Sequence, residues 1–190
     1  MAITGNAGAG LLTEDAPPGT GFLAGVCQDW EDAALPAKEA GIRVVTLRTG
    51  IVLAGAGGLL PRVALPFRFG VGGQLGDGRQ WMSWIAIDDL LGIIVEAIAN
   101  ERLVGPVNAV APQPVTNREF TRTLGRVLRR PAVARVPAFA LRLVAGQLAD
   151  ELILASQRAI PERLHAAGFR FMFPDLEQAL RFELGRPMEQ

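Results

Sequence analysis

The sequence predicts an α/β fold, with parallel strands and intervening helices in residues 1–130 and a small α+β domain in residues 131–190. Apolar residues recur at helical spacing from 22 to 40, and a run rich in β-branched residues follows from 42 to 48. A helix that leads into a strand buried on both faces is typical of parallel sheets. The parallel strands are expected near 43–48, 81–87 and 107–111.

The first 20 residues are rich in Gly, Ala, Thr and Pro, and they predict an irregular lead-in. Gly5, Gly8 and Gly10 are spaced somewhat like a phosphate-binding loop. No full strand precedes these glycines, however, and no apolar-periodic helix follows them. We therefore reject a nucleotide-binding loop at this position.

The predicted helix at 22–40 contains Pro36, which should kink or end it, and Gly41 separates the helix from the strand. Residues 49–73 form a long glycine-rich connection with a short helix that starts at Pro61. Long loops without regular structure are uncommon in compact domains and are often functional. This loop follows the carboxyl end of a predicted parallel strand, where open α/β sheets bind ligands.

The most distinctive stretch is residues 78–90, GRQWMSWIAIDDL, in which a glycine turn and an arginine precede an aromatic and β-branched run. Asp88 and Asp89 suit a helix start, because carboxylates accept hydrogen bonds from its first N–H groups and complement its dipole. The helix that follows is almost wholly apolar from 90 to 98, so we expect it to be buried.

The next segment predicts a short strand at 107–111 and an amphipathic helix after Thr116. Thr116 and Glu119 have the spacing of a capping box, in which each side chain satisfies a backbone donor of the other residue. The helix directs a row of arginines outward: Arg118, Arg122, Arg126, Arg129 and Arg130. An anion site and a solvated helix face both fit this row, and the pattern favours the solvated face.

Residues 131–190 predict a series of short elements. In order, these are a strand at 133–136, a helical stretch at 138–160 interrupted at Gly146, and a short helix at 161–168 that begins with proline and ends with glycine. Residues 169–173, FRFMF, alternate with period two, so we expect a last strand that pairs within this domain. Asp175 should cap a final helix at 176–184.

Composition excludes several classes of protein. Lys plus Arg and Asp plus Glu both total 19, and zero net charge gives no electrostatic argument for a nucleic-acid or membrane partner. One cysteine, Cys27, excludes an internal disulfide framework, and one histidine, His165, argues against a histidine-based metal site. No apolar run is long enough to span a bilayer. We expect a soluble cytoplasmic protein.

The order of these motifs resembles the C-terminal part of an extended short-chain dehydrogenase/reductase. The motifs that carry the resemblance are RTGIVL at 48–53, the glycine-rich loop, GRQWMSWI at 78–85 with the DDL that follows, GPVN at 105–108 and PVTNREF at 114–120. The chain is most similar to the nucleoside-diphosphate-sugar epimerase-like "epimerase family protein" group, whose small C-terminal domain of undefined function resembles residues 136–171. The resemblance covers the chain from about residue 11 onward. It implies the C-terminal portion of a Rossmann-like parallel sheet.

Extended members of this superfamily begin with a glycine-rich βαβ unit that holds the cofactor's pyrophosphate at a helix N-terminus. This sequence contains no such unit. By the resemblance, it begins just after the strand that would carry the family's catalytic Ser or Thr, and it lacks roughly the first hundred residues of a full member. We expect it to pair with the missing N-terminal half or with a second copy, because an unpaired sheet edge promotes association.

The superfamily's catalytic pair is Tyr-x-x-x-Lys, in which a tyrosinate transfers the proton and the lysine supports it and binds the ribose. The chain contains no tyrosine, and Cys27 and Glu31 occupy this spacing in the helix at 22–40. They are therefore the catalytic candidates that the resemblance implies. A carboxylate in place of the lysine would oppose a thiolate, so a packed helix residue is the favoured interpretation of Cys27.

The resemblance also implies NADP or NAD as the cofactor. The residues that it places near the nicotinamide lie at the end of the first predicted strand: Arg48, Thr49, Gly50, Ile51 and Val52. Arg79 is the implied contact to a substrate diphosphate, for which a guanidinium fork is well suited. Trp81 and Ser83 are further substrate candidates, although residues 81–84 alternate faces and at most two of them can face a cleft.

Three hypotheses about function follow. The first is an NAD(P)-dependent oxidoreductase or epimerase-like protein, acting on a nucleotide sugar or another small molecule and represented here by its substrate-binding part. The second is a non-catalytic ligand-binding module derived from the same fold. The third is an interaction module that depends on a partner. We favour the first for the family and expect these 190 residues alone to be inactive.

Overall fold

The structure is a computed structural model that describes residues 5–188, apart from the side chains of residues 144 and 145. The elements of its first part are β1 (Leu11–Leu12), α1 (Phe22–Asp32), α2 (Leu35–Glu39), β2 (Val45–Thr49), β3 (Ile51–Leu53), α3 (Leu59–Arg68), β4 (Gly73–Leu75), β5 (Trp81–Met82), β6 (Trp84–Ala86), α4 (Ile87–Ala99), β7 (Gly105–Ala109), β8 (Val115–Thr116) and α5 (Asn117–Leu128). Those of its second part are β9 (Ala134–Val136), α6 (Ala138–Ala145), the π-helical turn η2 (Ala149–Ile153), β10 (Arg158–Ala159), α7 (Glu162–Ala166) and α8 (Leu176–Glu183).

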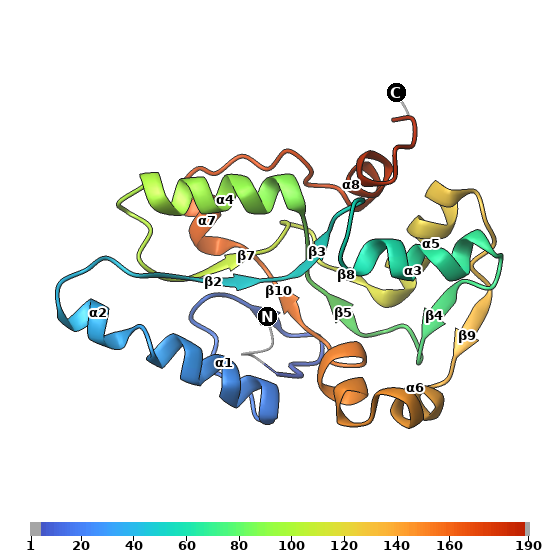
Figure 1. The fold of residues 1–190 in the computed structure, drawn as a ribbon, viewed down its shortest axis with the longest axis horizontal. Helices are drawn as coiled ribbons and strands as arrows, with labels where there is room; N and C mark the ends of the chain where they lie inside the picture. The colour runs from blue at the N-terminus through green and yellow to red at the C-terminus, as the bar shows by residue number, and fades with distance from the viewer. Residues whose placement is uncertain (1–4, 189–190) are drawn as a thin grey trace.

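The central strands are parallel, as the sequence predicts. β2 pairs with β7 and β3 pairs with β6, both in parallel. α4 lies on one face of β2 and β7, and α1 lies on the other (Figure 1). Side-chain alternation explains these layers: Val45 and Leu47 pack toward the core beneath α4, whereas Arg48 forms an ion pair with Glu31 of α1. The chain therefore has the α/β fold of a Rossmann-like sheet.

The main hydrophobic core lies where these strands meet α3, α4, α5 and α8. Trp84 at its centre is fully buried, and its indole Nε1 donates to the carbonyl of Gln113 at 2.9 Å. The other large side chains with almost no exposure include Leu53, Leu60, Ile85, Ile93, Leu124 and Leu180. Burial of one such aliphatic side chain contributes about 1.5–3 kcal/mol, so this cluster is the main stabilising feature of the fold.

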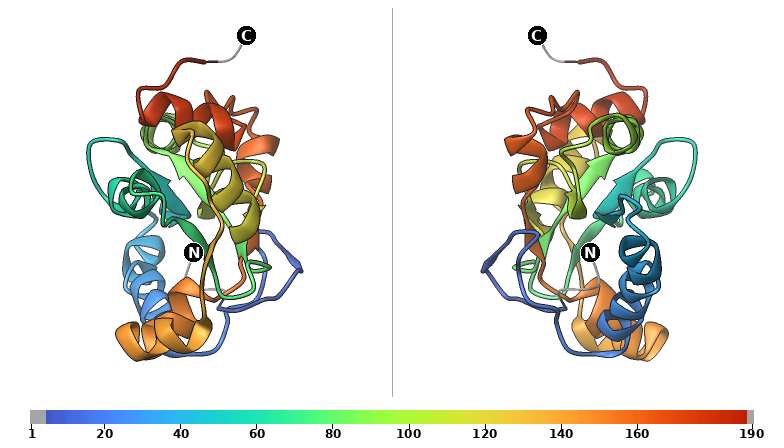
Figure 2. Two further views of the ribbon diagram at one scale, coloured as in Figure 1. Left: turned by 90° about the vertical axis from the view of Figure 1, so that its right-hand side faces the viewer. Right: turned by 90° about the vertical axis from the view of Figure 1, so that its left-hand side faces the viewer.

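The residues after 130 are joined to the first part of the chain by strand pairing. β9 pairs in parallel with β4, β10 pairs in parallel with β1, and α8 packs against α5. α6 and α8 nevertheless lie at opposite ends of the molecule (Figure 2). The segment after 130 therefore extends along the first part instead of forming a sheet of its own.

The strand predicted at 169–173 is absent: the structure has no strand between α7 and α8. The backbone N–H groups of Met172 and Phe173 donate to the Asp89 carboxylate at 2.6 and 2.9 Å, and these two N–H groups are therefore not engaged by a neighbouring strand. The rings of Phe169 and Phe171 pack edge to face, with centroids 5.0 Å apart. The alternating residues 169–173 therefore pack their rings in an irregular segment and do not form a strand.

The apolar helix predicted to be buried is buried on one face only. α4 buries Asp89, Ile93 and Ala97, whereas Leu91 and Val95 are exposed. Helical spacing places the buried and the exposed residues on opposite faces of α4, and no described element covers the exposed face. The Asp pair does begin this helix, but neither aspartate side chain caps it; Asp89 instead binds the segment before α8.

Other helix and strand boundaries differ from the predicted ones for local reasons. The helix predicted at 22–40 breaks into α1 and α2 just before Pro36, and the lead-in contains the short strand β1. The Glu14 carboxylate of this lead-in is buried and accepts from the backbone N–H groups of Asn108 and Arg163, at 3.1 and 3.3 Å. The helical stretch predicted to 160 ends earlier, because its last residues form β10.

Within residues 5–188, no helix combines the length and the apolar character needed to cross a membrane. The same part of the chain contains no cluster of three or more His, Cys, Asp and Glu side chains suited to a metal ion.

Candidate functional site

The backbone crosses closely at Gly50, between β2 and β3. The Gly50 N–H donates to the carbonyl of Ala109 at 3.1 Å, and the next N–H, of Ile51, donates to the carbonyl of Ser83 at 2.8 Å. A Cβ atom on Gly50 would lie 2.7 Å from that Ser83 oxygen, which is closer than side chains tolerate. The crossing brings the predicted cofactor residues 49–52 against the strand that carries the predicted substrate residues.

A bidentate ion pair joins two of the predicted site residues. Arg48 Nε and Nη2 donate to the two carboxylate oxygens of Glu31 at 2.8 and 2.9 Å, and Nη1 donates to the carbonyl of Glu14 at 2.9 Å. The hydrogen bond to Glu31 raises the pKa of Arg48 above its ordinary value, against the opposing effect of burial. The fork of Arg48 is therefore committed to holding α1 and the lead-in against β2.

Cys27 lies one helical turn before Glu31 on α1 and is a partly exposed free thiol. Residues four apart lie on the same helix face, so Cys27 is on the side of α1 that carries the ion pair. The role of Cys27 as a catalytic group stays a prediction.

The substrate candidates occupy three different environments. Ser83 is 4% exposed, and its hydroxyl donates to the carbonyl of Gln157 and accepts from the N–H of Ala159, each at 2.8 Å. Trp81 is partly buried under the guanidinium of Arg158, which lies 4.2 Å from the ring centroid. Arg79 is exposed, and its backbone N–H donates to Asp77 Oδ1 at 2.9 Å. Ser83 thus links strands, whereas Trp81 and Arg79 are available at the surface.

The sequence did not identify residues 156–158 as neighbours of this region. The Ser156 hydroxyl accepts from the N–H of Trp81 at 3.1 Å, and the Gln157 N–H donates to the Trp81 carbonyl at 3.0 Å. Arg158 Nε is buried and has no hydrogen-bond partner among the described residues. The polar run SQR, which interrupts the apolar spacing of the predicted helix, was the available signal.

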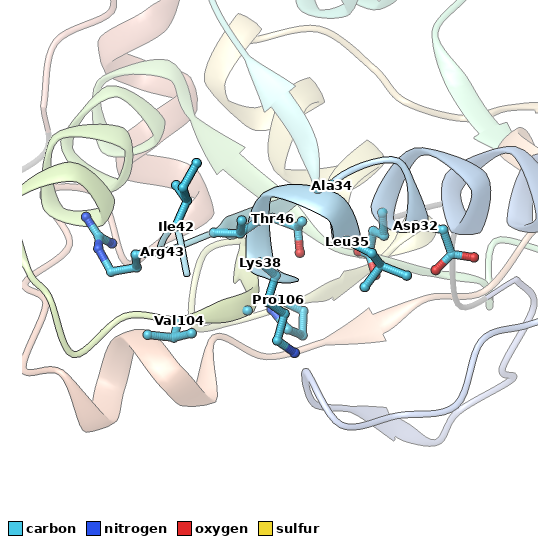
Figure 3. A pocket seen from close by; sticks show the side chains of 12 residues that line it. Asp32, Ala34, Leu35, Lys38, Ile42, Arg43, Thr46, Val104 and Pro106 are labelled. Atoms are coloured by element: carbon cyan, nitrogen blue, oxygen red, sulfur yellow. The ribbon is translucent and has the colours of Figure 1, made fainter. Parts of the chain in front are cut away.

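A separate hollow of about 200 Å³ lies between α1, α2 and the starts of β2 and β7 (Figure 3). Lys38, Arg43, Thr46 and Pro106 are among the residues that line it. It lies at the amino ends of the parallel strands, whereas ligands of open α/β sheets bind beyond the carboxyl ends. The geometry therefore favours the crossing at Gly50 as the ligand site over this hollow.

Sequence comparison identifies relatives along almost the whole chain. A family described as a domain of unknown function (DUF1731) matches residues 136–183. Epimerase family proteins of Mycobacterium leprae and Mycobacterium tuberculosis are 45% and 46% identical, over 97% and 96% of this chain and 60% and 61% of their own lengths. An Arabidopsis thaliana epimerase family protein, described as chloroplastic, is 40% identical over 93% of this chain and 50% of its own length. The chain thus spans about 60% of the first two relatives.

Solved structures agree with these matches. A human epimerase family protein, crystallised with NADPH, has a TM-score of 0.90 and 36% identity over 97% of this chain and 63% of that one. A nucleoside-diphosphate sugar epimerase from Corynebacterium glutamicum has a TM-score of 0.79 and 42% identity over 97% of this chain and 35% of that one. Along almost its whole length, the chain therefore matches the C-terminal part of epimerase family proteins.

Proposed function

We propose that this chain supplies the substrate-binding part of an NADP- or NAD-dependent oxidoreductase or epimerase whose substrate is a nucleotide sugar. The observation that carries the proposal is the crossing at Gly50, which brings residues 49–52 beside the Trp81–Ser83 segment at the carboxyl end of β2. The human relative was crystallised with NADPH, and the Corynebacterium relative is named a nucleoside-diphosphate sugar epimerase. These relatives support the cofactor and the substrate class.

The proposed roles follow from the contacts. Thr49, Gly50, Ile51 and Val52 pack near the nicotinamide through their backbone, and Arg48 positions them through its ion pair with Glu31. The exposed fork of Arg79 binds the diphosphate, and the Trp81 ring, already stacked on a guanidinium, forms part of the cleft wall. Cys27 and Glu31 remain the residues at the family's Tyr and Lys positions. Ser83 acts by holding β10 against the cleft.

The proposal includes a partner for the open sheet edge. One edge of β2 carries β7, and no described strand lies on the other. Because the chain spans about 60% of its first two relatives, a segment equivalent to their remaining part is the proposed partner, and a second copy is the alternative. We propose that the 190 residues alone do not turn over substrate. We also propose that residues 1–130 and 131–190 are the two units of the family architecture. The proposed location of the protein is the cytoplasm.

Thermal unfolding of the purified chain with and without NADPH or NADP tests this function. A ligand that binds the native state and not the unfolded state raises the melting temperature by mass action, and the rise grows with ligand concentration. We expect a dose-dependent rise with either cofactor, and a separate rise with UDP that is lost in Arg79→Gln. The absence of both rises would contradict the proposal and favour a non-catalytic or partner-dependent module.

A further inference from the structure

A second hollow, of about 230 Å³, lies between α5, β4 and β9. Its polar lining consists of Arg118 and Arg122 of α5, Arg135 of β9, Thr121 and Gln74, and its apolar lining consists of residues 132–134. In the parallel pairing of β4 and β9, Gln74 stands opposite Arg135, so both side chains point to the same face of the pair. Arg118 and Arg122 are one helical turn apart, which places them on one face of α5.

The three arginines of this hollow carry positive charge without a counter-ion. Among the described residues, no ion pair includes Arg118, Arg122 or Arg135. Arg118 Nη2 donates to the carbonyl of Asp77 at 3.1 Å. Arg126 on the same helix provides a contrast, because it pairs with Glu177. The charge is thus concentrated at the hollow in a protein whose net charge is zero.

Two buried polar side chains line the same hollow. Thr121 is 4% exposed and Gln74 is 9% exposed. Gln74 Nε2 donates to the Asp77 carbonyl at 3.4 Å, whereas the Thr121 hydroxyl has no hydrogen-bond partner within the described part of the chain. The Thr121 residue is buried, but its hydroxyl still reaches solvent and can donate to an acceptor oxygen of a ligand beside the three guanidinium groups.

We propose that this hollow binds the phosphate group of a small molecule. The forks of Arg122 and Arg135 would hold the phosphate oxygens, Arg118 would add charge, and the Thr121 hydroxyl would donate to an oxygen. Guanidinium forks match phosphate oxygens in pairs, and such charge-assisted hydrogen bonds are stronger than neutral ones. The site is distinct from the diphosphate contact proposed for Arg79, which is not among the lining residues. It does not depend on the proposed catalytic function.

Calorimetric titration of the full chain with inorganic pyrophosphate tests the site. We expect saturable binding with one site, and about a tenfold or greater loss of affinity in the double variant Arg122→Gln/Arg135→Gln. Both arginines are exposed, so the double variant should fold normally, and its thermal melt checks this. The matched control is Arg129→Gln/Arg130→Gln, which removes the same charge from exposed positions outside the hollow.

The control should bind pyrophosphate as the unaltered chain does, and Arg79→Gln should keep the binding that depends on Arg122 and Arg135. No binding by the unaltered chain, or an equal loss in the control, would overturn the proposal, because the second result indicates general charge attraction. Loss of binding in Arg79→Gln alone would assign the anion to the substrate turn and would also overturn it. Retained pyrophosphate binding without any effect of NADPH would support this site while contradicting the proposed cofactor function.

Discussion

Asp89 in the first turn of α4 binds the backbone of Phe173 across the core. Its Oδ2 accepts the Phe173 N–H at 2.9 Å, while Oδ1 accepts the N–H of Met172 at 2.6 Å. Asp89 is only 3% exposed, and each of its carboxylate oxygens accepts one of these hydrogen bonds. One side chain thus fixes the irregular segment that leads into α8.

Asp89→Ala should lower the free energy of unfolding by about 2–4 kcal/mol, because it leaves the buried N–H of Phe173 and the part-buried N–H of Met172 without an acceptor. Urea unfolding at neutral pH measures this loss. Asp88→Ala, the adjacent substitution in the same helical turn, should have a much smaller effect, since Asp88 is only partly buried. Equal losses in the two variants would contradict the assigned role of Asp89.

Gly50→Ala should destabilise the chain by about 1–3 kcal/mol, because the new Cβ meets a backbone oxygen that can move only with its strand. The control is Gly57→Ala, where a Cβ would meet nothing within 4 Å, and its stability should not fall. Thermal melts of both variants distinguish them. A Gly50→Ala variant as stable as the unaltered chain would show that the strands can separate at the crossing.

Arg48→Met keeps the apolar stem but removes the fork, and should cost about 1–3 kcal/mol of stability. The Arg48 and Glu31 side chains are 12% and 26% exposed, so solvent screens this pair only partly. The comparable bidentate pair of Arg142 with Asp150 is more than half exposed, and Arg142→Met should leave the melting temperature almost unchanged. A double-mutant cycle with Glu31→Gln isolates the coupling between Arg48 and Glu31, and zero coupling would refute the role assigned to this pair.

Glu177 should make the protein acid-sensitive. The hydrogen bond from Arg181 lowers the pKa of Glu177 below its ordinary 4.5, against the opposing effect of burial, and Arg126 adds to this lowering. Because the folded-state pKa is the lower one, the stabilisation is fully present above pH 4.5 and is lost as pH falls through the folded-state pKa. Urea unfolding from about pH 6 to about pH 3 should show a smaller acid loss in Glu177→Gln than in the unaltered chain. Parallel curves would contradict this.

Glu183 should have the opposite effect to Glu177 on how stability changes with pH. Burial raises the pKa of Glu183 above 4.5, and the charge of Asp88 adds to the effect, although the N–H of Gly55 donates to its carboxylate at 2.7 Å. The folded state therefore favours the protonated form, and stability from this group declines as pH rises through the folded-state pKa. Glu183→Gln keeps an acceptor for Gly55. It should be at least as stable as the unaltered chain at about pH 7 and lose that advantage below about pH 4.5 in unfolding experiments.

Local patterns predicted the local features well. Thr116 and Glu119 form the expected capping box, and the Asp175 side chain accepts from the N–H groups of Glu177 and Gln178. Each of these interactions involves residues within three positions of each other, so their spacing alone contains the information. The parallel strands were predictable for a similar reason, because runs of β-branched residues favour parallel sheets. The predicted burial of the first of them on both faces was wrong, since every residue of β2 is only partly buried.

Interactions between distant segments could not be predicted in this way. The position of Asp89 at the start of a helix also suits a helix cap. Only the folded chain shows that its carboxylate accepts from the N–H of Phe173. From the sequence, Ser83 is a polar candidate for a cleft. In the fold its hydroxyl instead accepts from the N–H of Ala159 in β10. Arg48 and Glu31 were assigned to the cofactor and to catalysis separately, and their attraction to each other depends on how α1 docks on β2. The roles of these candidate residues stay predictions, and the sequence could not show which partners they have in the fold.

The pairing of β1 with β10 constrains the order in which the molecule can form. Leu11 lies beside Arg158, so about 150 residues separate the two strands along the chain. At ordinary rates of synthesis the first strand waits roughly 8–30 seconds for its partner to leave the ribosome. Closing so long a loop is also slow because its entropy must be lost before the pair forms. The strand β1 is therefore paired only long after it is made.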